Sequence, residues 1–166
     1  MNLRKVLTGT AGVVGAIVLQ TTFFGRLTIA GIAPDAVLIA VLLFAVRQRS
    51  EGTIMFAFLS GLLFDALSST ALGLRAAVYT SVAFLAIRTI ERMDSGPVTV
   101  SAWIGLMTLG AVVLFLIVGS LFGQVTLDPG EAMRRVILVP IYNLVLALLL
   151  TPLISRLLAP TRRGFP

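Results

Sequence analysis

Residues 98–122 form a long apolar run that contains no charged side chain. The hydrocarbon core of a bilayer is about 30 Å thick, and a helix needs about 20 mainly apolar residues to cross it. Other apolar runs of similar length precede and follow this one. The sequence therefore predicts an all-α integral membrane protein, one polytopic domain over residues 1–166, with six transmembrane helices at residues 6–24, 27–46, 52–67, 72–90, 98–122 and 136–158.

The composition agrees with a membrane protein and excludes several classes of function. Hydrophobic residues make up 58% of the chain and charged residues 12%, whereas soluble domains have about 25% charged residues. A disordered chain would need low hydrophobicity and high net charge. The chain has neither Cys nor His, which excludes disulfides, thiolate or imidazole chemistry and Cys/His zinc sites. We therefore expect no cofactor and no metal.

The distribution of basic residues predicts the orientation of the chain in the membrane. Cytoplasmic loops of membrane proteins are enriched in Lys and Arg. With the N-terminus in the cytoplasm, nine basic residues lie inside and three outside, the latter being Arg26, Arg134 and Arg135. Both termini are therefore predicted to be cytoplasmic. The net charge of +6 is therefore interpreted as a topology signal. We expect the basic residues to contact the lipid bilayer and predict no nucleic-acid partner.

Asp65 is the most informative polar residue because it lies inside an apolar run. An acid within a membrane span is costly and indicates either a function or a partner that neutralises it. Arg75 is the natural partner, since the two residues stand on opposite arms of the hairpin at residues 68–71. Three interpretations stay open: a pair with Arg75 or a hydroxyl that fixes the hairpin, an ion or substrate site, and a contact to a partner protein. We favour the first.

Other residues are candidates for structural or interaction roles. Asp35 follows Pro34 at the start of the second run, where its charge suits the positive end of a helix dipole, so we predict a helix cap rather than a binding residue. Gly61 and Ala57 have the spacing that lets helices approach closely, within one protein or between two. Asn143, a polar residue in the sixth run, is predicted to bond freed carbonyls of its own helix or a neighbouring helix.

A catalytic site is not expected from this set of residues. General acid–base catalysis needs two positioned titratable groups, and Asp65 is the only acid deep within a predicted span. The chain is therefore predicted not to be an enzyme, with no catalytic, cofactor-binding or metal-ligating residue.

Several of these residues make the sequence resemble the bacterial rod shape-determining protein family MreD. The matching segments are Pro34-Asp35, Gly61-Leu62-Leu63-Phe64-Asp65-Ala66-Leu67-Ser68-Ser69, Leu72-Gly73-Leu74-Arg75-Ala76 and Tyr142-Asn143. The hairpin between the third and fourth runs is the specific part of the resemblance, which covers nearly the whole chain. The candidate structural or interaction residues are therefore Pro34, Asp35, Gly61, Asp65, Gly73, Arg75 and Asn143.

The resemblance implies a non-enzymatic membrane scaffold of the cell-elongation machinery (elongasome) in the bacterial cytoplasmic (inner) membrane. Such a scaffold would bind an MreC-like protein and help to organise peptidoglycan synthesis and rod cell shape, with RodA, a class B penicillin-binding protein and MreB as further partners. The resemblance also implies a fold similar to the S subunits of energy-coupling-factor transporters, although a shared fold does not establish a shared function. Two alternatives stay open: a vitamin-binding S subunit, and a small proton-coupled transporter that uses Asp65.

Overall fold

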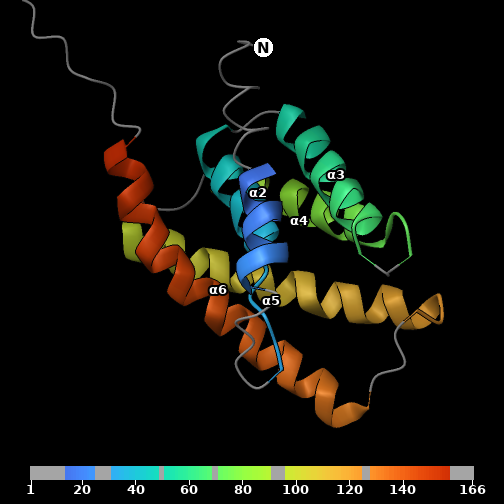
Figure 1. Cartoon of the computed structure of the whole chain (residues 1–166). Coiled ribbons are helices and arrows are strands. Elements are labelled where there is room, and N and C mark those ends of the chain that lie inside the picture. Colours follow the sequence, from blue (N-terminus) through green and yellow to red (C-terminus); the bar gives the residue numbers. More distant parts are fainter. Residues whose placement is uncertain are drawn as a thin grey trace, which may run out of the picture.

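The computed structural model of the protein describes residues 14–24, 31–48, 51–68, 71–90, 96–124 and 128–157. These residues are almost entirely helical, with short connections between the helices (Figure 1). Residues 14–24 form a helix that ends in the π-helical turn η1 (Gln20–Phe24), and the later elements are α2 (Ala36–Arg47), α3 (Glu51–Ala66), α4 (Leu74–Ile90), α5 (Pro97–Leu121) and α6 (Pro129–Leu157). The predicted all-helical fold class is confirmed for this part of the chain.

The central element of the bundle is α2, which contacts α3, α4, α5 and α6. Val37, Val41, Leu42 and Ala45 of this helix have no exposed surface. A helix that is apolar on all sides has to be buried. With 12 residues, α2 is only about 18 Å long at 1.5 Å per residue. Its first turn lies within the protein, where other segments have to satisfy its backbone.

The other helices pack around α2 as two pairs, α3 with α4 and α5 with α6. Gly61 of α3 lies directly against the backbone of α4, because a Cβ atom at this position would lie 2.5 Å from Ala76 Cα. In the second pair, a Cβ atom on Gly105 would lie 3.1 Å from Leu144 Cδ1. Small residues let helix backbones approach closely, so Gly61 is used for packing inside the chain.

The observed helices do not all have the lengths of the predicted spans. In the part of the chain that the structure describes, two stretches are long and apolar enough to cross a membrane, Pro97–Leu121 and Pro129–Pro152. The helices α3 and α4 have 16 and 17 residues, fewer than the about 20 that a perpendicular span needs. The number of six spans and the cytoplasmic termini therefore stay predictions.

Two helices begin at other residues than the apolar runs do. The second apolar run begins at residue 27, whereas α2 begins at Ala36, directly after the predicted cap Asp35. The sixth run begins at residue 136, whereas α6 begins at Pro129, where Asp128-Pro129 predicts the start of a short helix. Proline is favoured in the first turn of a helix, where its missing N–H costs nothing. The polar stretch before the sixth apolar run therefore continues the same helix.

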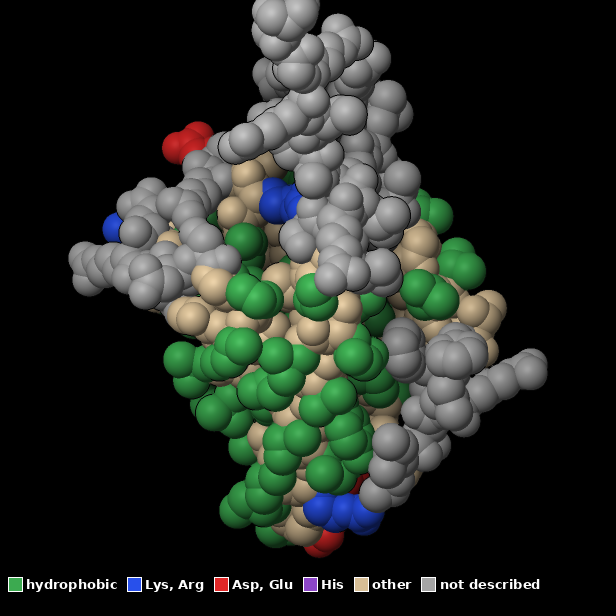
Figure 2. All heavy atoms as spheres, turned by 90° about the vertical axis from the view of Figure 1, so that its left-hand side faces the viewer, with side chains coloured by type: hydrophobic (Ala, Val, Ile, Leu, Met, Phe, Trp, Pro, Cys, Tyr) green, Lys and Arg blue, Asp and Glu red, His purple; other side chains and the backbone are tan. Residues whose placement is uncertain are grey.

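The exterior of the bundle is suited to lipid. Hydrophobic side chains cover the middle of the face in Figure 2, whereas the charged side chains lie toward its upper and lower ends. Leu106 and Ile117 of α5 and Leu149 of α6 are among the large hydrophobic residues that are more than half exposed, at 61%, 53% and 66%. Soluble proteins rarely expose apolar patches larger than a few hundred Å², so this exterior supports a location in the membrane.

We predict that Gly61→Ala lowers the free energy of unfolding by about 1–3 kcal/mol, the usual cost of overpacking a tight site. The new methyl group would overlap the backbone of α4 at Ala76. Gly110→Ala on α5 is the matched control, because a Cβ atom there meets nothing within 4 Å and Ala is favoured over Gly in helices by about 1 kcal/mol. Thermal unfolding of the purified chain in one detergent compares the variants. An unchanged midpoint for Gly61→Ala would contradict the close approach.

Candidate functional site at the start of the central helix

The residues before α2 form the polar centre of the bundle. Asp35 is the N-cap of α2, and its Oδ1 atom accepts a hydrogen bond from the backbone N–H of Leu38 at 2.9 Å. The first N–H groups of a helix have no partner within the helix, and a side-chain carboxylate at the N-cap satisfies one of them. The cap expected from the Pro34-Asp35 sequence is therefore present.

Two amide side chains hold the backbone of residues 34–36 from opposite sides. Gln20 donates from Nε2 to the carbonyl of Pro34 and accepts from the N–H of Ala36 at Oε1, both at 2.8 Å. Asn143 of α6 accepts from the N–H of Asp35 at 2.9 Å and donates to the carbonyl of the same residue at 3.3 Å. These paired bonds join the helix of residues 14–24 and α6 to the start of α2.

Further side chains extend this cluster to α4 and α5. The buried hydroxyl of Tyr79 on α4 donates toward the carboxylate of Asp35, at 2.7 Å from Oδ2 and 2.9 Å from Oδ1. The Nδ2 atom of Asn143 also donates to Oγ1 of Thr108 on α5, at 3.2 Å. Asn143 therefore bonds neighbouring helices, which is one of the two roles predicted for it. The polar centre of the bundle links α2 to four surrounding segments.

Asp65 performs a similar task at the hairpin between α3 and α4. Its side chain is fully buried, and Oδ2 accepts the backbone N–H groups of Gly73, Arg75 and Ala76 at 3.0, 2.9 and 3.3 Å. The carboxylate thus caps the first turn of α4 from the end of α3, where the helix dipole favours negative charge. The backbone of Gly73 turns into this cap with φ +99°, a conformation that glycine adopts without strain.

The predicted pairing of Asp65 with Arg75 is present but is the weaker part of this arrangement. Nη1 of Arg75 lies 3.7 Å from Oδ1 of Asp65 and donates to Oγ of Ser68 at 2.9 Å. The guanidinium group lies over the ring of Phe64 at 4.4 Å and near that of Phe115 at 5.4 Å. Cation–π contacts of this kind are attractive, so Arg75 connects the hairpin to α5.

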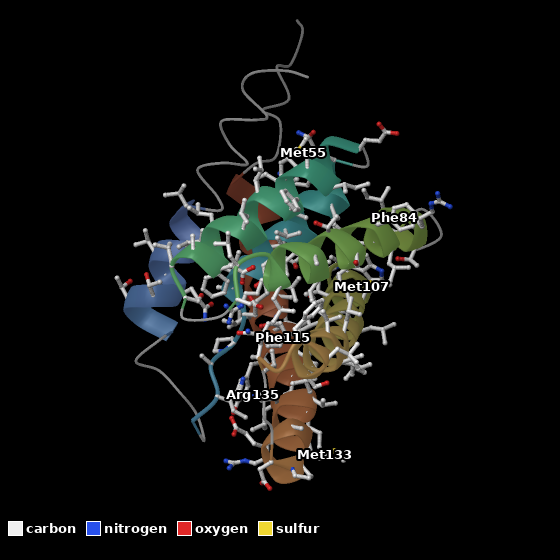
Figure 3. All side chains as sticks on the ribbon, turned by 90° about the vertical axis from the view of Figure 1, so that its right-hand side faces the viewer. Met55, Phe84, Met107, Phe115, Met133 and Arg135 are labelled. Atoms are coloured by element: carbon white, nitrogen blue, oxygen red, sulfur yellow. The ribbon has the colours of Figure 1, made fainter. Side chains whose placement is uncertain are left out.

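A cavity of about 250 Å³ lies beside the polar centre. Its polar lining includes Gln20, Asp35, Arg75, Tyr79 and Arg135, and its apolar lining comes mainly from α5 and from residues 32–34 before α2. Figure 3 shows Phe115 and Arg135 on the same side of the bundle, close to the segment that leads into α2. The cavity therefore lies between the segment before α2 and the helices α3, α4, α5 and α6.

The structure brings together most of the residues that the sequence singled out. Pro34, Asp35 and Arg75 line the cavity. Asn143 accepts the backbone N–H of Asp35, and Asp65 accepts the backbone N–H of Arg75. Gly61 and Gly73 act through the backbone. The described residues contain no group of three or more Asp, Glu, His or Cys side chains that could hold a metal ion.

Sequence reasoning missed Gln20, Tyr79 and Thr108 as members of this site. A polar amide inside the first apolar run was a signal for Gln20, because uncompensated polar groups are costly in a span. Tyr79 stands four residues after Arg75 and therefore on the same helix face. For Thr108 there was no signal, because a threonine in a helix commonly bonds its own backbone, as Thr108 also does to the carbonyl of Ile104.

We predict that Asp65→Asn lowers the free energy of unfolding by about 1–3 kcal/mol, because buried donors would lose a charged acceptor. Glu131→Gln is the matched control: Glu131 pairs with Arg135 four residues later on the exposed side of α6, and such pairs contribute about 0–1 kcal/mol. Chemical or thermal unfolding in detergent measures both variants. Equal losses for the two would contradict the capping role of Asp65.

We predict an energetic coupling of about 1.5–3 kcal/mol between Tyr79 and Asp35, the range of a hydrogen bond to a charged group. Tyr79→Phe removes the donor, Asp35→Asn removes the charge, and the double variant should lose less stability than the sum of both. A double-mutant cycle of unfolding free energies measures this coupling. Strictly additive losses would contradict the hydrogen bond between α4 and the start of α2.

Comparison with known proteins identifies the family of this chain. The model of one protein family, the rod shape-determining protein MreD, matches residues 3–160. Searches of the curated proteins and of the solved structures gave no significant match. The family match covers almost all of the 166 residues, including both the hairpin with Asp65 and the polar centre at Asp35. The chain therefore belongs to the MreD family of rod shape-determining proteins.

Proposed function

We propose that the protein is a non-enzymatic membrane scaffold that binds an MreC-like protein within the elongation machinery. Membership of the MreD family gives it a role in rod shape determination. The further steps, binding of an MreC-like partner and organisation of peptidoglycan synthesis with RodA, a class B penicillin-binding protein and MreB, belong to the proposal. The proposed setting is the bacterial cytoplasmic membrane, with six spans and both termini in the cytoplasm.

The observation that carries this proposal is the use of the buried polar groups. Asp35, Asn143 and Asp65 bond to backbone groups at the starts of α2 and α4. These bonds fix helices relative to one another, and a buried polar network that is fully satisfied makes a structure rigid. A rigid frame with an apolar exterior is what a scaffold needs, since partners are held by its shape.

The same observation disfavours the proton-coupled transporter. A carboxylate that carries protons through a membrane has to release its partners during each cycle. Asp65 instead accepts three backbone N–H groups and lies beside the guanidinium group of Arg75. Loss of these bonds would uncap α4. The vitamin-binding S subunit has no support from a solved structure, since none matches the chain.

The surface for the partner is proposed to lie on the exposed apolar faces of the outer helices. Gly61 is enclosed between α3 and α4, so this glycine acts in folding rather than in direct partner contact. Leu59 of α3, Leu106 of α5 and Leu149 of α6 are all more than half exposed. Each of these residues marks one exposed face that a partner helix could contact. Close packing of side chains drives helix association in membranes.

We predict that the tagged chain and an MreC-like protein, produced together, purify as a stoichiometric complex from nanodiscs. One of the variants Leu59→Trp, Leu106→Trp and Leu149→Trp should block the complex and leave the fold intact, because a bulky ring prevents helix contact at that face. Thermal unfolding of each variant serves as the folding control. Cell shape provides the second readout: deletion of the gene should produce round cells. No complex, together with normal rods after deletion, would overturn the proposal.

A further inference from the structure

The cavity beside Asp35 has features of a binding site that the scaffold role does not use. Its volume of about 250 Å³ is just below the about 300–1,000 Å³ of pockets for drug-sized ligands. A cavity of this size suits a small polar group. Arginine side chains from α4 and α6 and apolar side chains from α5 line the same space. The occupant should therefore combine a charged part with an apolar part.

The charged lining of the cavity favours an anion. Arg75 and Arg135 contribute two positive charges, and Asp35 contributes one negative charge. The carboxylate of Asp35 is directed at donors within the protein, namely the N–H of Leu38 and the hydroxyl of Tyr79. Within the lining itself, positive charge is therefore in excess by one, while the carboxylates of Asp65 and Glu131 stand beside Arg75 and Arg135 at 3.7 and 2.6 Å. Guanidinium groups are planar and bind phosphate oxygens through two parallel N–H bonds.

Arg75 is held in place before any ligand arrives. Its Nη1 atom donates to Ser68, and its guanidinium lies over the ring of Phe64 and near that of Phe115. The carboxylate of Asp65 is 3.7 Å away, longer than a charge-assisted hydrogen bond of about 2.7–2.9 Å. A side chain that is already fixed loses little entropy on binding. The guanidinium is thus ordered by its contacts with Ser68, Phe64 and Asp65.

Arg135 reaches the cavity from the start of α6. Its Nε and Nη2 atoms donate to Oε1 of Glu131 at 3.1 and 2.6 Å, and both side chains are exposed, at 42% and 50%. Exposed pairs of this kind contribute about 0–1 kcal/mol. Exchange of the carboxylate for a phosphate therefore costs little. Arg135 can close over a ligand that Arg75 holds from the other helix.

We propose that this cavity binds a phosphate ester, with Arg75 and Arg135 as the residues that contact its phosphate. Two sources share this chemistry: the phosphodiester head group of a membrane lipid, and a soluble phosphate ester. The apolar wall with Phe115, Leu116 and Val139 lies against the remainder of the ligand.

The experiment uses the purified full chain in an uncharged detergent. Native mass spectrometry measures binding of dioleoyl phosphatidylglycerol, with dioleoylglycerol as the probe that has the same chains but no phosphate. Isothermal titration calorimetry with glycerol 3-phosphate tests the soluble source. We expect one of two results. Tighter binding of phosphatidylglycerol than of dioleoylglycerol identifies a lipid head group as the source, and binding of glycerol 3-phosphate identifies a soluble phosphate ester.

Variants separate the cavity from general attraction between lipid and basic residues. Arg135→Gln should weaken binding about tenfold, the effect of about 1.4 kcal/mol, and Arg135→Lys should weaken it less. Arg134→Gln is the matched control, because Arg134 is the neighbouring exposed arginine on α6 and is not part of the cavity lining. Val112→Phe, which narrows the cavity without changing its charge, should also reduce binding.

Two results would overturn the proposal. One is equal loss of binding in Arg134→Gln and Arg135→Gln, which would place the phosphate on the surface of α6. The other is absence of binding for both probes to a chain whose thermal midpoint shows that it is folded. The measurement does not involve the MreC-like protein, so its outcome is separate from that of the scaffold proposal.

Discussion

The whole bundle depends on how the backbone at the start of α2 is satisfied. In the hydrocarbon region no water is available to bond exposed N–H and C=O groups, and α2 is short enough that its first turn lies inside the protein. The carboxylate of Asp35 and the amides of Gln20 and Asn143 supply the missing partners. Since these side chains come from different segments, satisfying one helix end also fixes the relative positions of several helices.

The hairpin with Asp65 repeats this solution at the start of α4. In both places a carboxylate that would be costly alone in a membrane caps a helix, and at Asp65 the cap comes from the preceding helix. Arg75 and Arg135 are then the charged residues of the cavity lining that do not cap a helix. This division is compatible with both the proposed scaffold role and the proposed site for an anionic group.

Sequence reasoning predicted the helical class, the cap at Asp35 and the proximity of Asp65 to Arg75, because each depends on local spacing. From hydropathy alone it did not find the first residues of α2 and α6, since hydropathy locates apolar stretches and not the hydrogen bonds that begin a helix. It also treated the guanidinium of Arg75 as the main partner of Asp65. The backbone of α4 takes that role because the Gly61 contact brings α3 and α4 very close together.

The sequence by itself determined that this chain forms apolar helices, that Asp65 needs a partner and that the resemblance points to MreD. These conclusions follow from composition, run length and motif, which are local properties of the chain. Only the tertiary structure decided that Gln20, Tyr79 and Asn143 meet at Asp35 and that Arg75 and Arg135 line one cavity. These residues are far apart in the chain, and their contacts depend on how the helices cross, which periodicity does not encode.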